Sequence, residues 1–357
     1  MAKRIKGTSS TMVAIGLDLA DVNSDWLGLD EEGTVVARDR VKTTTAELQR
    51  VFGAIQATTI AIEVGSNSAW VARLLKSLGH DVIVANARRV ALIHQNKRKN
   101  NKIDAELLAR LARADRALLF PIQHRDENSQ ADLAVLRSRD ILVASRTKLI
   151  NHVRGQSKAF GTKLPKCSAE AFVAKISDKV PAALRSAINP LLEQIAQMTK
   201  TIKAYDREVA SMIKRHPDVA KVSQITGVGP LTSLAYVLTI EDPYRILRSR
   251  SAGAYFGLVP GSDDSGEDHE PLRITKEGDK FCRRLLVSAA QYITGPFGTD
   301  SDLRRHGLAI AERGGKRAKK RAVVAVARKL AVLMHRLWIS GADYVPLYNA
   351  KAQPTAA

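Results

Sequence analysis

The sequence predicts an α/β domain followed by a mainly α-helical region. In the first 117 residues, short runs of branched apolar residues alternate with segments that have helical spacing. Beyond Pro121 the apolar residues recur only at helical spacing. A chain of 357 residues is also too long for one ordinary core, so we expect two or three domains.

The N-terminal elements follow each other in a definite order. Strands are expected at 12–18, 26–30, 34–41, 59–63 and 82–85, and helices at 45–54, 68–78 and 104–117. A hairpin turn at 31–33 joins the second and third strands, and a threonine caps the first helix. Three meandering strands followed by alternating strands and helices predict a mixed sheet covered by helices, the arrangement of ribonuclease-H-like and RuvC-like nuclease domains. This domain is placed at residues 10–130.

A helical coiled-coil segment is expected at residues 131–217. After Pro190, apolar residues alternate steps of four and three, which is the spacing of a heptad seam. The seam residues are Leu191, Ile195, Met198, Ile202, Tyr205, Val209 and Met212. Two interpretations remain open: an intermolecular coiled coil, or a helix packed against its own domain.

The third domain, at residues 218–345, is predicted to be mainly α-helical. Gly227 and Gly229 form a tight turn that opens a helix, so backbone N–H groups there could face a phosphate; a plain helix start would have the same sequence. A loop at 257–275 precedes a helix at 279–293, and a final helix ends near Ser340. In that helix Arg321, Arg328 and His335 recur every seven residues, which predicts one face for nucleic-acid backbone and another for packing.

Charge is distributed unevenly along the chain. The 56 Lys and Arg exceed the 36 Asp and Glu, for a formal net charge of +20. Residues 1–85 hold nine basic and ten acidic residues, whereas 86–160 hold 16 and seven, and 301–340 hold 11 and two. A solubilising surface could account for one basic run, but two zones favour nucleic-acid backbone as the partner. The candidate contacts in the last zone are Lys316, Arg317, Lys319, Lys320 and Arg321.

Composition excludes several classes of protein. A hydrophobic content of 45% excludes a disordered basic tail, and two cysteines exclude a disulfide-rich secreted scaffold. No apolar run is long and uncharged enough to span a bilayer, and Asp18 interrupts the one that follows the basic N-terminus. We therefore expect a cytoplasmic protein without a membrane partner.

Three carboxylates occupy positions suited to metal binding. Asp18 ends the first predicted strand, Glu63 ends the fourth, and Asp104 opens the helix after the fifth. Neighbouring strand ends lie close together, and carboxylates there can hold the two Mg²⁺ ions that assist phosphoryl transfer. Each could alternatively be a strand-end carboxylate or a helix cap. Asp21 and Asp25 are expected to be solvated loop residues.

These segments resemble the DEDD insertion-sequence transposase family, the bridge-RNA-guided recombinases related to Piv-type DNA invertases. The similarity rests on GLDLA around Asp18, AIEVGS around Glu63 and NNKIDAELLAR around Asp104. In that family the third motif carries two acids three residues apart, whereas this sequence has Asn101 at the first position. The resemblance therefore implies three carboxylates in place of four and weaker binding of a second Mg²⁺. Glu106 points to a different side of the helix and is not expected to replace the missing acid.

Residues 254–287 resemble the C-terminal domain of the same family. They contain an aromatic-Gly-Leu-x-Pro entry, a Ser-Gly pair, an Ile-Thr-Lys-x-Gly segment and an Arg-Arg-Leu-Leu helix. Ser265 matches the family's nucleophile, and Gly266 would let the DNA backbone approach. The residues expected to neutralise the phosphate are Arg273, Lys276, Arg283 and Arg284. Without the resemblance, the Ser-Gly pair would be an ordinary turn, and Ser262 is the local alternative.

The resemblance implies a transposase of a mobile insertion element. Such an enzyme would cut and rejoin DNA through a serine–DNA phosphodiester with Mg²⁺, as a homo-oligomer (dimer or tetramer) guided by a bridge RNA. Base pairing would then supply specificity while the protein holds RNA and DNA backbones. Two alternatives remain open: a metal-dependent Holliday-junction resolvase-like nuclease without a covalent intermediate, and an inactive nucleic-acid-binding remnant, which Asn101 suggests.

Overall fold

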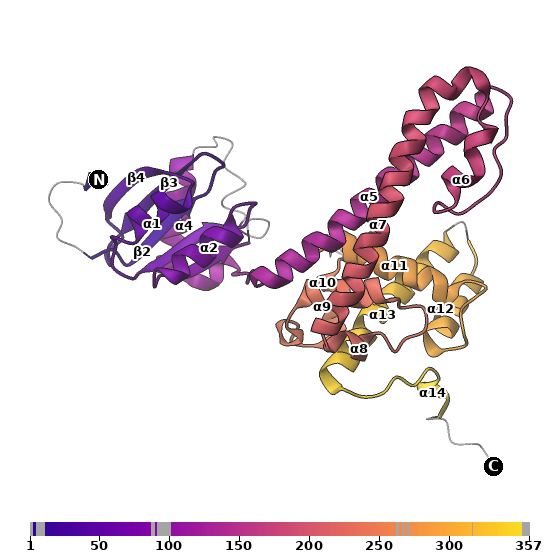
Figure 1. Cartoon of the computed structure of the whole chain (residues 1–357). Helices are drawn as coiled ribbons and strands as arrows, with labels where there is room; N and C mark the ends of the chain where they lie inside the picture. The colour runs from indigo at the N-terminus through magenta and orange to yellow at the C-terminus, as the bar shows by residue number, and fades with distance from the viewer. Residues whose placement is uncertain are drawn as a thin grey trace, which may run out of the picture. The chain divides into compact units, whose positions relative to one another are not determined.

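The chain folds into two compact units, Met1–Arg125 and Asp126–Ala357. The computed structural model describes residues 3–4, 11–86, 90, 101–261, 264–265, 268–269, 272–315 and 317–351. In Figure 1 the first unit is indigo to purple and the second runs from magenta to yellow. The predicted combination of an α/β region and a mainly helical region is confirmed.

Unit 1 is built on one mixed sheet. Its strands are β1 (Lys3–Arg4), β2 (Ala14–Asp18), β3 (Asn23–Leu29), β4 (Val35–Lys42), β5 (Thr59–Glu63) and β6 (Asp81–Ala85). They lie in the order β1-β4-β3-β2-β5-β6. β2, β3 and β4 form an antiparallel meander, while β5 is parallel to β2 and β6 is parallel to β5. The expected order of strands and helices is therefore observed.

Helices cover both faces of this sheet. They are α1 (Thr45–Phe52), α2 (Ser68–Ser77), α4 (Asn101–Ala114) and the 3₁₀ helix η1 (Arg116–Leu119). The Thr44 side chain accepts a hydrogen bond from the Glu47 N–H and caps α1, as predicted. On β2, Ile15 and Leu17 join the core beneath α1 and α2, whereas Gly16 faces α4. This alternation is the two-residue period of a strand buried on both faces.

Unit 2 begins with two long helices, α5 (Glu127–Ala159) and α7 (Arg185–Arg215), which lie side by side (Figure 1). Between them lie α6 (Phe172–Ile176), η2 (Ser177–Lys179) and η3 (Ala182–Leu184). Of the predicted seam on α7, Ile195 packs with Ile150 and Val153 of α5, and Val209 and Met212 pack with Leu133 of the same helix. Ile195, Ile202, Val209 and Met212 are thus buried within their own chain, as the second interpretation expected, whereas the other three seam residues are half-buried. An intermolecular coiled coil is not confirmed.

Helix α7 contains a proline. The helix begins at Arg185, so that Pro190 lies inside it. Proline lacks an N–H and removes one backbone hydrogen bond from the helix interior. The apolar contacts of Ile188, Leu192 and Ile195 with α5 and α6 outweigh that loss.

The remaining helices of unit 2 pack around α9. They are α8 (Asp218–Val222), α9 (Pro230–Ile240), η4 (Pro243–Arg245), η5 (Ser249–Ser251), α10 (Ala252–Tyr255), α11 (Lys280–Thr294), α12 (Asp302–Glu312), α13 (Ala318–Ser340) and α14 (Tyr348–Lys351). Every residue of α9 from Thr232 to Ile240 is buried. The Tyr236 hydroxyl donates to the Ala331 carbonyl oxygen at 2.6 Å, which ties α9 to α13.

The face predicted for α13 is partly wrong. Arg321 and Arg328 are exposed, but His335 is fully buried, with one ring nitrogen 3.0 Å from the Ser249 hydroxyl and the other 2.8 Å from the Pro243 carbonyl oxygen. The seven-residue repeat drifts around a helix of 3.6 residues per turn, so the third position reaches the core. None of the described helices is long and apolar enough to cross a membrane.

Candidate active site

Asp18 and Glu63 lie at the same edge of the sheet. Asp18 ends β2 and Glu63 ends β5, and Leu17 and Ile62 are partners in the parallel register of the two strands. Parallel neighbours present their carboxyl ends on one side, so the last residues of both strands come together there. Both residues are half-buried.

Gly16 lets α4 approach this edge closely. A Cβ at Gly16 would lie 1.9 Å from the Ala105 carbonyl oxygen and 2.6 Å from the Ala109 nitrogen. No side chain fits there, so the α4 backbone lies directly on β2. Asp104, in the first turn of α4 and next to Ala105, is thereby brought to the end of the strand that carries Asp18.

The electrostatics of Asp18 show that the three carboxylates are neighbours. The pKa of the Asp18 carboxyl is raised from 3.8 to about 6, and burial is the largest cause. The negative charges of Asp104, Glu63 and Asp25 contribute to the same rise, in decreasing order. A cluster of partly buried carboxylates that oppose each other's ionisation is typical of a functional site.

The donor set fits Mg²⁺. Carboxylate oxygens are the ligands that this ion prefers, and it is usually held by one or two of them together with water and substrate phosphates. Within the part of the chain that the structure describes, no three His, Cys, Asp or Glu side chains are gathered closely enough to hold an ion by themselves. The cluster therefore offers a partial coordination shell to which a phosphodiester could contribute oxygens.

Asp25 is not a solvated loop residue, as the sequence had suggested. It lies on β3 directly opposite Asp18, with 5% of its surface exposed. The Arg40 guanidinium donates to both of its carboxylate oxygens, at 3.2 and 3.1 Å. The strand begins three residues before the predicted position because the Asn23–Asp25 segment pairs with β4 despite its polarity.

Asn67 ties together the loops that follow β2 and β5, and sequence reasoning missed it. Its Nδ2 donates to the Ala20 carbonyl oxygen and to an Asp21 carboxylate oxygen, at 3.5 and 3.4 Å. Its Oδ1 accepts a hydrogen bond from the Trp70 indole at 3.1 Å. The loops after Asp18 and Glu63 are thus held to each other. A contact between two loops produces no spacing pattern in the sequence. The available signal was that Asn67 follows the candidate metal ligand Glu63 by only four residues.

Asn101 and Glu106 occupy the same helix as Asp104. Asn101 is the first residue of α4, three positions before Asp104, which is the spacing that puts two residues on one side of a helix. Glu106 is engaged elsewhere: its carboxylate accepts from Arg38 at 3.0 Å and from Arg110 at 2.7 Å. These ion pairs agree with the expectation that Glu106 does not join the acidic cluster.

Ser265 lies in a short hairpin of unit 2. It belongs to β7 (Asp264–Ser265), and its register partner is Asp268 of β8 (Asp268–His269). Backbone bonds close the base of this loop, from the Thr275 N–H to the Val259 oxygen and from the Gly261 N–H to the Arg273 oxygen.

The loop is anchored by a close backbone crossing. A Cβ at Gly257 would lie 2.3 Å from the Glu277 oxygen, and one at Gly278 would lie 2.1 Å from the Tyr255 oxygen. Both glycines also have positive φ, which explains the aromatic-Gly and Lys-x-Gly segments of the sequence. Arg283 donates to the Phe256 and Glu277 carbonyl oxygens at the same crossing, so it holds the loop base.

The other candidate nucleic-acid contacts have varied surroundings. Arg284 pairs with Asp140 and lies over the Phe281 ring, whereas Arg273, Lys276, Arg317, Lys319, Lys320 and Arg321 are exposed. Lys316 lies outside the described residues. Gly227 has positive φ and packs against Tyr292 and Ile293 of α11. Gly229 is the N-cap of α9, with open space where its side chain would be, beside a small cavity of about 380 Å³.

Comparison with known proteins identifies the family. Residues 15–158 match a family described as a transposase, DEDD_Tnp_IS110, and residues 219–298 match the transposase IS116/IS110/IS902 family. A transposase for insertion sequence element IS1111A from Coxiella burnetii is 27% identical, covering 94% of this chain and 92% of its own length. A probable family 20 transposase from Pseudomonas aeruginosa is 26% identical, covering 82% of this chain and 88% of its own. A transposase for IS1328 from Yersinia enterocolitica is also 26% identical, over 78% and 82%.

The chain belongs to the DEDD insertion-sequence transposase family. It is accordingly a transposase of an insertion element, an enzyme that binds, cuts and rejoins DNA. The two matched regions contain the two groups of site residues: the first spans the acidic cluster of unit 1, and the second spans Ser265 and its loop. The end of this transposase beyond residue 298, including α13, lies outside both matches.

Proposed function

We propose that this transposase breaks and rejoins DNA through a phosphodiester bond between Ser265 and the DNA. The observation that carries the metal-dependent half of the proposal is the raised pKa of Asp18 next to Asp104 and Glu63. A cluster that resists ionisation gains stability from a divalent cation, and the family to which the chain belongs is named for its acidic residues. The antiparallel meander followed by two parallel strands supports a ribonuclease-H/RuvC-like nuclease domain.

In this proposal the carboxylates hold the metal and Ser265 forms the covalent bond. Asp18, Glu63 and Asp104 would hold Mg²⁺, which when bound supplies positive charge to stabilise the phosphate in the transition state. The Ser265 oxygen forms a bond to phosphorus while the bond from phosphorus to one sugar oxygen breaks, and the serine's proton leaves to solvent as the sugar oxygen takes one up. The phosphodiester count is unchanged, so a free hydroxyl of another strand can reverse the step without ATP. Acids and serine could come from one subunit or two.

The guide and assembly belong to the same proposal. A bridge RNA that pairs with element and target DNA would supply sequence specificity, and the protein would grip the backbones. The uneven charge supports this role, because the zones at 86–160 and 301–340 carry a large excess of Lys and Arg. A homo-oligomer, either a dimer or a tetramer, would bring two element ends together.

The direct test is a search for the covalent intermediate. Full-length protein is incubated with guide RNA, labelled DNA and Mg²⁺, denatured, and examined for DNA that migrates with the protein. We expect an adduct in the wild type and in Ser262→Ala, and none in Ser265→Ala. An adduct that persists in Ser265→Ala and is lost in Ser262→Ala would show that Ser262 is the nucleophile and would contradict this proposal.

A metal-dependent resolvase-like nuclease is the second candidate. One observation favours it. The whole acidic cluster belongs to unit 1, whereas the Ser265 loop belongs to unit 2, so the cluster is complete without the serine. Mg²⁺-dependent cleavage that survives Ser265→Ala without an adduct would support it. Asn101→Asp separates both candidates from an inactive remnant, because restoring the acid should strengthen Mg²⁺ binding and raise the rate of an impaired enzyme.

A further inference from the structure

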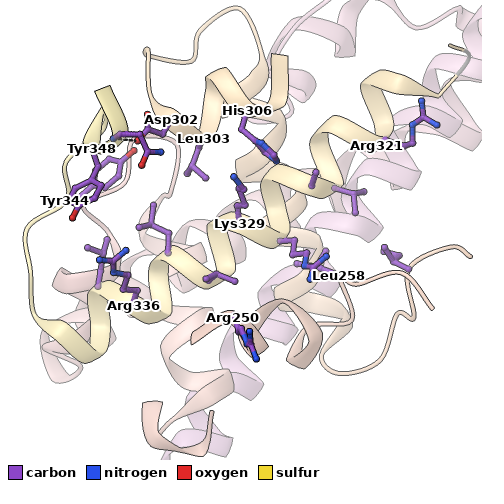
Figure 2. A pocket seen from close by; sticks show the side chains of 18 of the residues that line it. Arg250, Leu258, Asp302, Leu303, His306, Arg321, Lys329, Arg336, Tyr344 and Tyr348 are labelled. Carbon is purple, nitrogen blue, oxygen red and sulfur yellow. Dashed lines mark hydrogen bonds between the residues drawn. The ribbon is translucent and has the colours of Figure 1, made fainter. Parts of the chain in front are cut away.

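A large groove runs along α13 in unit 2. Its volume is about 1580 Å³, well above that of a typical small-molecule site. Its walls come from α12, from residues 258–260 and 272–276, and from the segment 342–349 that follows α13. Figure 2 shows the labelled side chains spread along α13, from Arg321 at one end to Arg336 and the two tyrosines at the other.

The rim of this α13 groove is strongly basic. Nine Lys and Arg line it, against two Asp. Five of the nine come from α13 itself: Lys320, Arg321, Arg328, Lys329 and Arg336. Asp302, one of the two acids, accepts a hydrogen bond from the Asn349 N–H at 3.0 Å, so one of its carboxylate oxygens is engaged by the backbone.

Within the described part of the chain, the groove cations lack the carboxylate partners that other arginines of the unit have. Arg137 pairs with Asp279, Arg215 with Asp132 and Arg305 with Asp300. Among the described residues, by contrast, none of the nine groove cations forms an ion pair with a carboxylate. So much uncompensated positive charge around one groove favours a polyanionic ligand.

The floor of the groove is apolar. It includes Leu258, Leu303, Val324, Val332 and Leu333. The outside of a nucleic-acid duplex presents phosphates and sugars, which would leave such a floor uncovered. A single strand can turn its unpaired bases inward and its phosphates outward, so it matches both the floor and the rim.

Two tyrosines stand at one end of the groove. Tyr348 is 59% exposed, and the Arg336 guanidinium lies 5.8 Å from its ring centroid. Exposed rings of this kind stack with bases without regard to their sequence. From Arg321 to Arg336 the helix rises by about 22 Å, which corresponds to at most about six nucleotides, the number for fully stacked bases spaced by about 3.4 Å.

Packing holds the central cation in place. A Cβ at Gly253 of α10 would lie 2.7 Å from the Arg328 Cγ, so only glycine leaves room for the Arg328 side chain to pass. Across the groove, burial and the nearby charges of Lys329 and Arg313 lower the pKa of His306. The lowered pKa agrees with a positive local potential.

We infer that the α13 groove binds a single polynucleotide strand, with its bases on the apolar floor and its phosphates on the basic rim. This inference rests on the proposed nucleic-acid role and deepens it, because it assigns the form of the nucleic acid and the place where it binds. Most of the groove residues come from the part of the chain beyond residue 298, which neither family match covers. Single-stranded DNA and single-stranded RNA both carry unpaired bases and a phosphate backbone, which are the two features that the groove is inferred to bind.

The test measures binding by fluorescence anisotropy in EDTA, where no Mg²⁺-dependent chemistry occurs. The probes are 12-nucleotide oligothymidine, 12-nucleotide oligouridine and a 12-base-pair DNA duplex, each over a range of salt. The groove variant is Arg328→Gln/Arg336→Gln, and the matched control removes two exposed cations of α7 that do not line the groove, Arg207→Gln/Lys214→Gln. Circular dichroism confirms that each variant is folded.

We expect the groove variant to lose at least about tenfold in single-strand affinity, with the slope of log K against log salt smaller by about 1.4 for two lost phosphate contacts. The control should lose less. Tyr348→Ala should lose about fivefold or more and Tyr348→Phe should retain binding, because stacking needs the ring and not the hydroxyl. Stronger binding of oligouridine than oligothymidine would identify RNA as the natural strand, and the reverse would identify DNA.

The inference is overturned if the groove variant binds single strands no worse than the control, or if the wild type prefers the duplex and Tyr348→Ala has no effect. Neither result bears on the covalent step. A missing adduct in the Ser265 experiment would likewise leave the strand-binding result standing, so the two proposals fail separately.

Discussion

At the scale of single residues, Asp18 shows how the acidic cluster lowers the free energy of unfolding. Its folded-state pKa of about 6 exceeds the ordinary value of 3.8, so the folded protein binds this proton more tightly than the unfolded chain. Unfolding therefore releases a proton between about pH 4 and pH 6, and the free energy of unfolding falls as pH rises through that window. Functional sites often retain such unfavourable charges because the ligand needs them.

Replacing Asp18 should therefore stabilise the metal-free protein. We expect Asp18→Asn to unfold at a higher denaturant concentration than the wild type above pH 6 in EDTA, with the difference vanishing below about pH 4. Mg²⁺ should stabilise the wild type and leave the stability of the variant unchanged, so the difference in stability between the two proteins should become smaller. Asp178→Asn, at an exposed position of unit 2, serves as the control and should show neither effect. A wild type that is more stable than Asp18→Asn at pH 8 without metal would contradict this reading of the cluster.

At the scale of elements, the sequence predicted most of what positions the site. The strands ending at Asp18 and Glu63 were predicted to the correct last residue, because buried apolar runs stop there and polar loops begin. The helix carrying Asp104 was predicted as well, although it starts at Asn101, three residues earlier. The local sequence pattern was sufficient to predict these strands, because a strand buried on both faces must be a continuous run of apolar residues.

The sequence could not predict features that depend on contacts between distant segments. Asp25 lies buried on β3 between β2 and β4, where Arg40 of the next strand compensates its charge. Pro190 lies within α7 because apolar contacts outweigh one lost hydrogen bond. Asn67 acts between two loops. Each departs from a local rule, and tertiary packing decides the outcome.

Gly16 is the residue on which the packing of α4 against β2 depends. In Gly16→Ala the new methyl group would fall 1.9 Å from the Ala105 oxygen, so α4 must move away from the strand and carry Asp104 with it. We expect a loss of about 1–3 kcal/mol in the free energy of unfolding, together with a loss of Mg²⁺-dependent activity. Gly65→Ala is the matched control, because a Cβ there meets nothing within 4 Å, and it should keep its stability. Denaturant unfolding of both variants measures the difference; equal stability would mean that α4 does not lie on β2 as described.

At the scale of the whole molecule, the division into two units has a direct consequence for folding. The described apolar clusters of unit 1 and those of unit 2 share no residue, so each unit has its own core. The start of α5 is also fixed within unit 2, since the Asp126 N–H donates to a Glu241 carboxylate oxygen at 2.7 Å and its side chain accepts from the Ser129 N–H at 2.8 Å. A unit with its own core and its own caps can fold alone.

A fragment spanning residues 123–357 should therefore fold without the sheet domain and keep the α13 groove. We expect a mainly helical circular dichroism spectrum, one cooperative thermal transition and the single-strand affinity of the full chain in EDTA, because every residue that lines the groove lies in this fragment. The complementary fragment, residues 1–122, should bind single strands more weakly, since it holds 18 basic and 13 acidic residues and none of the residues that line the groove. Folded fragments with the affinities exchanged would show that strand binding belongs to the sheet domain. An unfolded 123–357 fragment would show instead that the helical unit depends on the sheet domain, against the separation of their cores.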